Sequence, residues 1–161
     1  MYRIRTIQTK DNAEIARIIR QVSKEFGLAA ESGFAVADPI LDQLSVVYDQ
    51  PYAQYWVIEN ELGEIFGGGG LSPLNGDEHI LEIQKMYFLP EIRKLGFAQH
   101  ILNLCFNFAK EKGFQALYLE TTQQLWQAVK LYEKLGFLHL DTPQGNTGHS
   151  HACEIWMLKT L

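Results

Sequence analysis

The hydrophobic pattern changes from a strand period to a helix period near the N-terminus. Residues 2–7 alternate apolar and charged side chains, which predicts a half-buried strand. Apolar residues then recur at helical spacing up to Phe26, and Gly27 provides a stop. Asp11 and Glu14 have the spacing of a capping box. The pattern therefore predicts an amphipathic helix that begins at Asp11.

A second, shorter helix follows a segment with no clear period. Residues 28–37 are rich in Ala, Gly and Ser and fit neither template. The pair Asp38-Pro39 is typical of a helix start, and apolar residues continue at helical spacing to Tyr48.

Extended segments and turns dominate the middle of the chain. Three aromatic or β-branched runs are separated by a turn at 59–63 and by the hairpin signal Asn75-Gly76. The three predicted strands are 55–58, 65–71 and 80–88.

The C-terminal half returns to alternating helices and strands. A helix is predicted from Gly96 to Gly113 and another from Gln123 to Gly136, each with an apolar face and a glycine stop. The remaining predicted strands are 117–119, 137–140 and 152–159. The order β-α-α-β-β-β-α-β-α-β-β indicates an α+β fold, in which helices flank one mixed, mostly antiparallel sheet.

Four consecutive glycines, Gly67 to Gly70, fall inside a predicted strand. Glycine weakens a strand, so such a run indicates that another backbone or side chain lies close against it. A flexible loop is an equally good interpretation of the sequence.

Composition narrows the classes of function. A chain of 161 residues with 47% apolar content fits one domain, here residues 1–161. The net charge of −5 opposes binding to nucleic acid or to an anionic membrane surface. The N-terminus has no apolar segment typical of a signal peptide, so we expect a cytoplasmic protein.

The two cysteines carry little chemistry in the sequence. Cys105 falls at an apolar helix position, and Cys153 falls in a predicted strand. We expect two buried free thiols, without a disulfide or a metal site.

The segment with the most chemical content runs from Pro90 to Ala98, where a strand ends, a glycine-bearing turn follows and a helix begins. Unpaired N–H groups and the helix dipole make such a helix start suitable for a pyrophosphate. Arg93, Lys94 and Lys85 could add positive charge locally. An ordinary turn with solvated basic residues is the alternative, and one glycine alone would favour it.

A second motif favours the pyrophosphate site over the ordinary turn. The residues Arg93-x-x-Gly96-x-Ala98 resemble the Q/R-x-x-G-x-G/A pyrophosphate loop of the GNAT (GCN5-related) N-acetyltransferases. Downstream, the segment from Ala128 through Leu131-Tyr132 to Gly136-Phe137 resembles the A-x-x-L-Y-x-x-x-G-F motif of that family. The two motifs occur in the order and at the separation of the family.

The resemblance implies acetyl-coenzyme A as co-substrate, bound where two strands splay apart, and no metal. The backbone of the strand that ends at Phe88 would pair with the pantetheine amides, and the N–H groups from Lys94 to Gln99 would hold the pyrophosphate. Gly67–Gly70 would leave room for an acceptor near the thioester. The implied cofactor-binding residues are Met86, Tyr87, Phe88, Arg93, Lys94, Leu95, Gly96, Phe97, Ala98 and Gln99.

Transfer of an acetyl group to an amine requires one proton to leave the nucleophile and one to reach the departing thiolate. Tyr132 matches the family position whose phenol faces the coenzyme sulfur, so it is the candidate acid; a core tyrosine is the alternative. Glu82, eleven residues before Arg93, is the candidate base. Glu120 is the second choice for the base, and an ordered water is a further alternative.

Two features lie outside the family pattern. Many members have Asn three residues before the alanine of the second motif, where this chain has Leu125 followed by Trp126. The polar loop 142–151 contains His149 and His151, which could be a metal pair, a base or a substrate contact. The sequence offers no third ligand, so a polar hairpin is favoured over a metal site.

The resulting hypothesis is direct transfer from acetyl-coenzyme A to a primary amine in a ternary complex, without an acyl-enzyme, because neither cysteine has a placed base. The acceptor would be a small molecule or a peptide, and a homodimer stays open. A non-catalytic acyl-coenzyme A sensor is the alternative from another class. An N-terminal acetylase of proteins is a third interpretation, and no accessory docking segment in the sequence supports it.

Overall fold

The computed structural model describes residues 1–28 and 39–161 of the chain. Seven strands of the described part form one mixed sheet in the order β1-β2-β3-β4-β5-β7-β6. The strands are β1 (Tyr2–Thr6), β2 (Gln54–Asn60), β3 (Ile65–Leu74), β4 (Asp77–Phe88), β5 (Ala116–Thr121), β6 (Leu138–His139) and β7 (Ile155–Thr160). The α-helices are α1 (Asn12–Glu25), α2 (Leu44–Val47), α3 (Phe97–Glu111) and α4 (Trp126–Lys134), with 3-10 turns η1 (Thr9–Asp11), η4 (Leu41–Gln43), η5 (Pro90–Ile92) and η6 (Gln123–Leu125).

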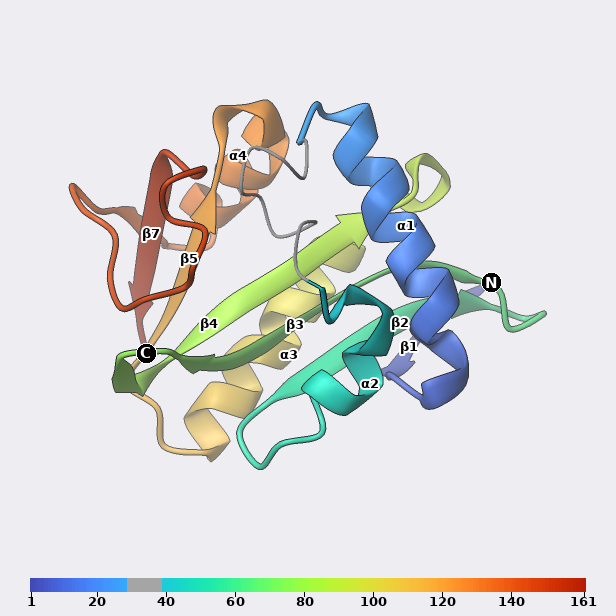
Figure 1. Cartoon of the computed structure of the whole chain (residues 1–161), viewed down its shortest axis with the longest axis horizontal. Coiled ribbons are helices and arrows are strands. Elements are labelled where there is room, and N and C mark those ends of the chain that lie inside the picture. Colours follow the sequence, from blue (N-terminus) through green and yellow to red (C-terminus); the bar gives the residue numbers. More distant parts are fainter. Residues whose placement is uncertain (29–38) are drawn as a thin grey trace.

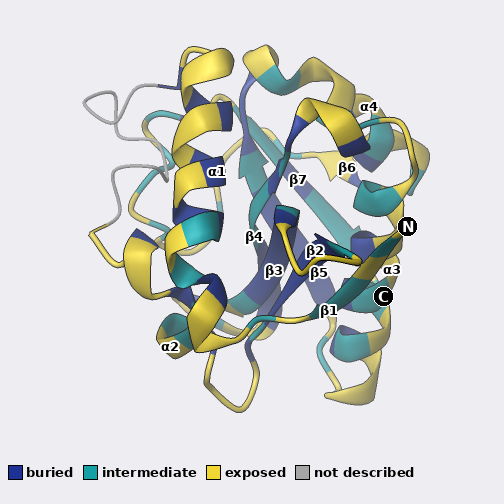
Figure 2. Ribbon diagram, turned by 90° about the vertical axis from the view of Figure 1, so that its right-hand side faces the viewer, coloured by how far each residue is buried: buried dark blue, intermediate teal, exposed yellow. Residues whose placement is uncertain are grey.

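Helices cover both faces of the sheet. Helices α1 and α2 lie on one face, and α3 and α4 lie on the other (Figures 1 and 2). Buried residues are concentrated on the strands and on the inward sides of the helices (Figure 2). Each face has its own core: Ile15, Ile18 and Ile19 of α1 are buried on one side, and Ile101 and Leu102 of α3 on the other.

The predicted element order and α+β class are confirmed. All strand pairs of the sheet are antiparallel except β4 and β5, which are parallel because a helical crossover through α3 joins them. The start of the second helix at Asp38 lies outside the described residues. The observed segment there begins at Leu41 with η4 and continues into α2.

Two details of the sequence prediction are wrong. Asp11 does not cap α1 with Glu14; its carboxylate accepts hydrogen bonds from Arg5 and from the Gln8 amide, in a capping box one turn earlier. Cys153 lies in the loop before β7 rather than in a strand, although it is buried as expected. For Asp11, the contacts with Arg5 and Gln8 take the place of the local pattern.

The glycine run lies inside β3, and the close-approach interpretation is confirmed. A Cβ atom at Gly69 would lie 2.4 Å from Met86 Cγ, and one at Gly68 would lie 2.7 Å from Tyr55 Cε1. Side chains of β2 and β4 therefore fold over β3 at its centre, in space that only glycine leaves open.

The parallel pair β4 and β5 separates at its C-terminal end. Their pairing ends at Glu82 and Tyr118, although both strands continue for several residues. Lys85 has a positive φ of 51°, beside an irregularity in the β3–β4 register, and its carbonyl accepts a 2.7 Å hydrogen bond from the Tyr55 hydroxyl. This bulge turns the end of β4 away from β5 and opens the sheet where the candidate site lies.

Candidate functional site

A cleft of about 690 Å³ lies where β4 and β5 separate. The end of β4, the loop before α3, the first turn of α3 and one side of α4 form its walls. All the residues expected to hold a coenzyme line it except Leu95, which is exposed. They are Met86, Tyr87, Phe88, Arg93, Lys94, Gly96, Phe97, Ala98 and Gln99.

The start of α3 presents backbone donors to this cleft. Gly96 has a φ of +87°, a conformation that disfavours residues with a side chain, and Lys94 precedes it at +66°. The amides of Phe97, Ala98 and Gln99 begin the helix, so no preceding turn supplies them with a carbonyl partner. The arrangement fits the anion site expected from the sequence.

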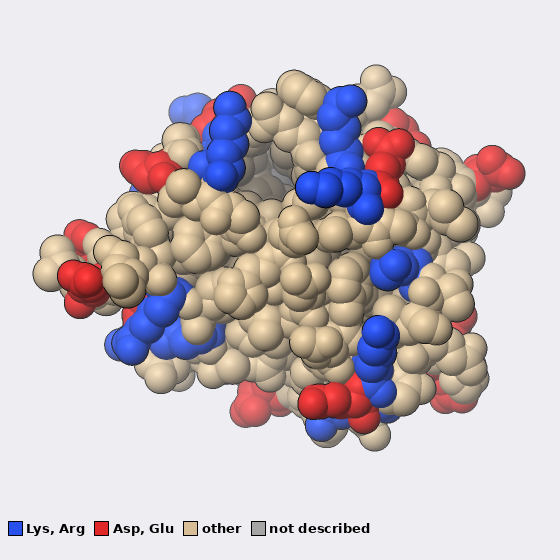
Figure 3. Space-filling model, turned by 180° about the vertical axis from the view of Figure 1, so that it is seen from behind, with Lys and Arg blue, Asp and Glu red and all other residues tan. Residues whose placement is uncertain are grey.

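The basic residues near this turn are distributed differently from the prediction. Arg93 lines the cleft, but its guanidinium binds Glu25 of α1 at 2.6 Å and the Phe88 carbonyl at 2.9 Å. Lys85 faces a second cavity instead of this cleft. Lys94 therefore supplies the local charge, and on the face seen in Figure 3 basic side chains border a hollow on two sides.

Beyond Glu82, β4 has a strand neighbour on one side only. Tyr87 and Phe88 pair with Gly68 and Gly67 of β3, whereas their other edge has lost β5. The backbone edge from Met86 to Phe88 thus faces the cleft, as an added pantetheine strand requires.

A second cavity of about 510 Å³ adjoins the cleft on the opposite side of this gap. Four residues line both spaces: Met86, Tyr87, Leu125 and Tyr132. These residues form the boundary that the cleft and the cavity share, here called the mouth. Many family members have Asn where this chain has Leu125. The mouth therefore has an apolar side chain at that position instead of an amide.

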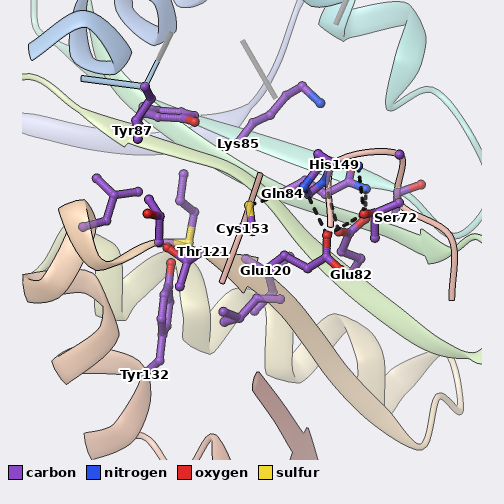
Figure 4. Close-up of a pocket in the computed structure, with 18 of the residues that line it drawn as sticks. Ser72, Glu82, Gln84, Lys85, Tyr87, Glu120, Thr121, Tyr132, His149 and Cys153 are labelled. Carbon is purple, nitrogen blue, oxygen red and sulfur yellow. Dashed lines mark hydrogen bonds and ion pairs between the residues drawn. The ribbon is translucent and has the colours of Figure 1, made fainter. Parts of the chain in front are cut away.

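Tyr132 lies on α4 and points from below into the second cavity (Figure 4). Its ring packs edge-on against Phe137 with centroids 5.7 Å apart, so it is also part of the core. Burial raises the pKa of its phenol above the usual range. The phenol thus stays protonated at neutral pH and can act as a proton donor.

The far end of the second cavity holds both candidate base residues. Glu82 of β4 and Glu120 of β5 have side chains that are 4% and 0% exposed. His149 lies between them: its Nε2 is 3.6 Å from Glu82 Oε2, and its Nδ1 is 3.2 Å from Glu120 Oε1 (Figure 4). Burial opposes the charge on this ring, but contacts with Cys153 and Glu82 raise the pKa of His149 to about 10.

Further hydroxyl groups fix Glu120. The hydroxyls of Tyr118 and Ser150 donate to its Oε2 at 2.6 Å, and that of Thr147 donates to its Oε1. Glu82 has a longer chain of partners, since Gln84 donates to it at 2.6 Å and Tyr48 donates to Gln84. The two carboxylates are therefore held rigidly at one end of the cavity.

The loop that carries His149 is attached to the sheet. The Asn146 amide donates to the Asn75 carbonyl at 2.7 Å, and the Asn75 side chain donates back to Asn146. Cys153 Sγ lies 3.7 Å from His149 Nδ1, so the expectation that neither cysteine has a base nearby is wrong. His151 is exposed and takes no part in the cluster.

The sequence pattern singles out each of these acidic residues and His149 but does not indicate that they associate. Nothing in the local pattern shows that a loop residue bridges two strands. Donor atoms of Glu82, Glu120 and His149 lie within 4.8 Å of one another, so these side chains could also hold a metal ion. A third potential ligand, which the sequence pattern did not offer, is thus present in space.

The acceptor space predicted beside Gly67–Gly70 is not observed. Side chains of Tyr55, Met86 and Phe88 occupy it, and among β3 residues Ser72 lines the second cavity instead.

Within the described part of the chain, no helix has the length and apolarity needed to cross a membrane.

Comparison with known proteins agrees with this geometry. The model of the acetyltransferase (GNAT) family matches residues 19–137. The chain is 52% identical over 159 residues to the uncharacterized N-acetyltransferase YjgM of Escherichia coli, covering 98% of this chain and 94% of that protein. It is 24% identical over 128 residues to an uncharacterized N-acetyltransferase of Schizosaccharomyces pombe, covering 80% and 77%.

Solved structures show the same fold. A GNAT-family acetyltransferase of Staphylococcus aureus superposes with a TM-score of 0.85 at 21% identity, covering 100% of this chain and 99% of that one. The spermidine N-acetyltransferase of Vibrio cholerae, solved with coenzyme A and spermine, superposes with a TM-score of 0.68 at 19% identity, covering 99% and 95%.

Proposed function

The chain belongs to the GNAT family of N-acetyltransferases, and we propose that it moves an acetyl group from acetyl-coenzyme A directly to a primary amine in a ternary complex. One observation carries this proposal: the cleft and the second cavity share a mouth lined by Met86, Tyr87, Leu125 and Tyr132. A thioester at that mouth is reachable from both sides.

The coenzyme occupies the cleft in this proposal. Its pyrophosphate lies on the amides at the start of α3, where Gly96 lets the backbone approach closely. Its pantetheine arm lies along the open edge of β4 from Met86 to Phe88. That path leads the thioester from the phosphate end to the mouth.

The acceptor occupies the second cavity, and two side chains move protons. Glu82 takes a proton from the acceptor's ammonium group, and the amine nitrogen then attacks the thioester carbonyl. When the carbon–sulfur bond breaks, the Tyr132 phenol donates its proton to the thiolate of coenzyme A. The second proton that the nitrogen loses as it becomes an amide then restores the phenol. Glu120 holds the acceptor in line with Glu82.

A covalent route through Cys153 is the competing mechanism, because its thiol lies 3.7 Å from His149. That route requires His149 to accept the thiol proton. His149 Nδ1 lies closer to Glu120 Oε1, at 3.2 Å, than to the thiol, so the ring nitrogen that this route requires already has a carboxylate partner. Direct transfer is therefore favoured.

The acceptor is a small-molecule or peptide amine in this proposal. The Vibrio relative by fold acts on spermidine, which is a precedent for an aliphatic amine in this architecture. The comparisons give the non-catalytic sensor no support. A cytoplasmic location and a homodimer stay predictions of the sequence.

The test is release of free coenzyme A thiol from acetyl-coenzyme A by the purified protein, measured against a panel of polyamines, amino acids, aminoglycosides and peptides. Thiol release that requires one class of amine supports the proposal and identifies that class. Tight binding of acetyl-coenzyme A without thiol release for any amine would contradict it.

A further inference from the structure

Two buried carboxylates and one imidazolium leave the end of the acceptor cavity with a formal charge of −1. Counted as ionised, Glu82 and Glu120 contribute −2, and the His149 ring, which lies within ion-pair distance of both carboxylates, contributes +1. Charges of this kind are stable inside a protein only when paired with opposite charges or hydrogen bonds. His149 supplies the pairing cation for both carboxylates at once.

The position of that cation coincides with the place where the reaction needs one. An aliphatic amine arrives at neutral pH as an ammonium ion, since its pKa is about 10.4 for a lysine-like group. The base Glu82 must contact this ammonium, yet its Oε2 already lies 3.6 Å from His149 Nε2, and both side chains line the same cavity. Substrate and ring therefore compete for one site.

We propose that His149 is a tethered stand-in for the acceptor's ammonium group, so that acceptors bind between Glu82 and Glu120 by displacing its ring. This inference rests on the proposed function and names the acceptor class: protonated aliphatic amines are accepted, and uncharged arylamines are rejected. His149 is thus a specificity-determining residue, because only another cation replaces its charge beside both carboxylates, whereas Gln84 and the three hydroxyls offer hydrogen bonds without charge.

The exchange preserves the charge of the cluster. One cation leaves and one cation enters, so the carboxylates keep their formal balance throughout. The ring is the most exposed of the three side chains, at 22%, which gives it a route to solvent. Asn146 stays bonded to Asn75 while the ring rotates out, and no opening of the loop is required.

Three variants test the exchange by steady-state kinetics with the amine that wild type acetylates, at saturating acetyl-coenzyme A. His149→Gln removes the competing charge and is expected to lower the acceptor KM by about tenfold. His149→Lys restores a tethered cation and should return the KM toward the wild-type value. His151→Gln, in the same loop but exposed and outside the cluster, is the matched control and should change nothing.

A second measurement does not depend on knowing the acceptor. Titration with n-butylammonium, followed through the ring resonances of His149 by NMR, is expected to move them toward those of an exposed imidazole. The uncharged isostere n-butanol should leave these resonances unchanged. If wild type acetylates no amine, the proposed function fails, whereas the butylammonium titration still reports on the cluster.

An acceptor KM that is unchanged or higher in His149→Gln would overturn the inference, because it would make the ring a contact of the acceptor rather than its competitor. A ring that keeps its position at saturating butylammonium would do the same. Finding one zinc ion per chain in the purified wild-type protein and none in His149→Gln would also overturn the inference, since the cluster would then be a metal site.

Discussion

His149 Nδ1 lies 3.2 Å from Glu120 Oε1, which joins the last long loop of the chain to the centre of the sheet. The same ring also reaches Glu82 on the neighbouring strand. Loss of this ring is expected to destabilise the fold in a pH-dependent manner.

His149→Gln should reduce the free energy of unfolding at neutral pH by about 2 kcal/mol, the scale of hydrogen bonds to charged groups. The pKa of His149 is about 10 in the folded protein and about 6.5 when unfolded, so its contribution is full below pH 6.5. It is lost as pH rises through 10. Urea unfolding of both proteins across this range measures the difference, and a constant difference would contradict the account.

Gly96→Glu should prevent coenzyme binding, because it places a side chain and a negative charge at the proposed pyrophosphate site. Gly113→Glu is the matched control at the other end of α3: that glycine also has a positive φ, of +80°, and open space around it. Both variants should lose similar stability from backbone strain. Calorimetric titration with acetyl-coenzyme A should separate them, and equal affinities would refute the site.

Tyr132→Phe should lower kcat by about 10²-fold with little change in the affinity for acetyl-coenzyme A, because the proposed acid is removed while the ring still packs on Phe137. Tyr52→Phe removes a phenol from an exposed ring on Phe114 and serves as control. Should Tyr132→Phe change only the melting temperature, the tyrosine is a core residue.

Glu82→Gln and Glu120→Gln should differ in kinetics. Loss of the base at Glu82 is expected to reduce kcat by about 10²-fold or more. Loss of Glu120 should mainly raise the acceptor KM, because that carboxylate orients the ammonium group. Initial rates with varied acceptor distinguish the two patterns; the reverse assignment would make Glu120 the base.

Glu59 tests a stability determinant away from the site. Its buried carboxylate binds Arg5 and Arg3, and these contacts lower its pKa to about 2. The stabilisation is present above the ordinary carboxyl pKa of about 4.3 and is lost as pH falls toward 2. Glu59→Gln should cost about 2 kcal/mol at neutral pH and much less in acid, as measured by denaturant unfolding.

The elements of the fold were largely predictable because their patterns are local. The period of α1, the Asn75-Gly76 turn and the glycine after each long helix all carry the signal in adjacent residues. Asp11 is the N-cap residue of α1, as predicted, but the capping box with Glu14 is absent, because the Asp11 carboxylate binds Arg5 and the Gln8 amide. The spacing of Asp11 and Glu14 does not show how the start of the helix lies against Arg5 of β1.

The sequence predicted which residues belong to the candidate site, but not which of them contact one another. The two motifs indicated the cleft around Gly96 and the tyrosine at 132, since short-range spacing sets a turn and a helix face. The bridge from Glu82 through His149 to Glu120 brings two strands and a loop together, and no spacing rule relates them. The same holds for the contact between Cys153 and His149.

Rapid-quench measurement of free thiol shows whether the amine attacks the thioester directly at the shared mouth. Enzyme mixed with acetyl-coenzyme A alone should show no burst of thiol, and steady release should begin only when the acceptor amine is added. A burst of one thiol per chain without acceptor, with the acetyl group recovered on Cys153, would contradict direct transfer.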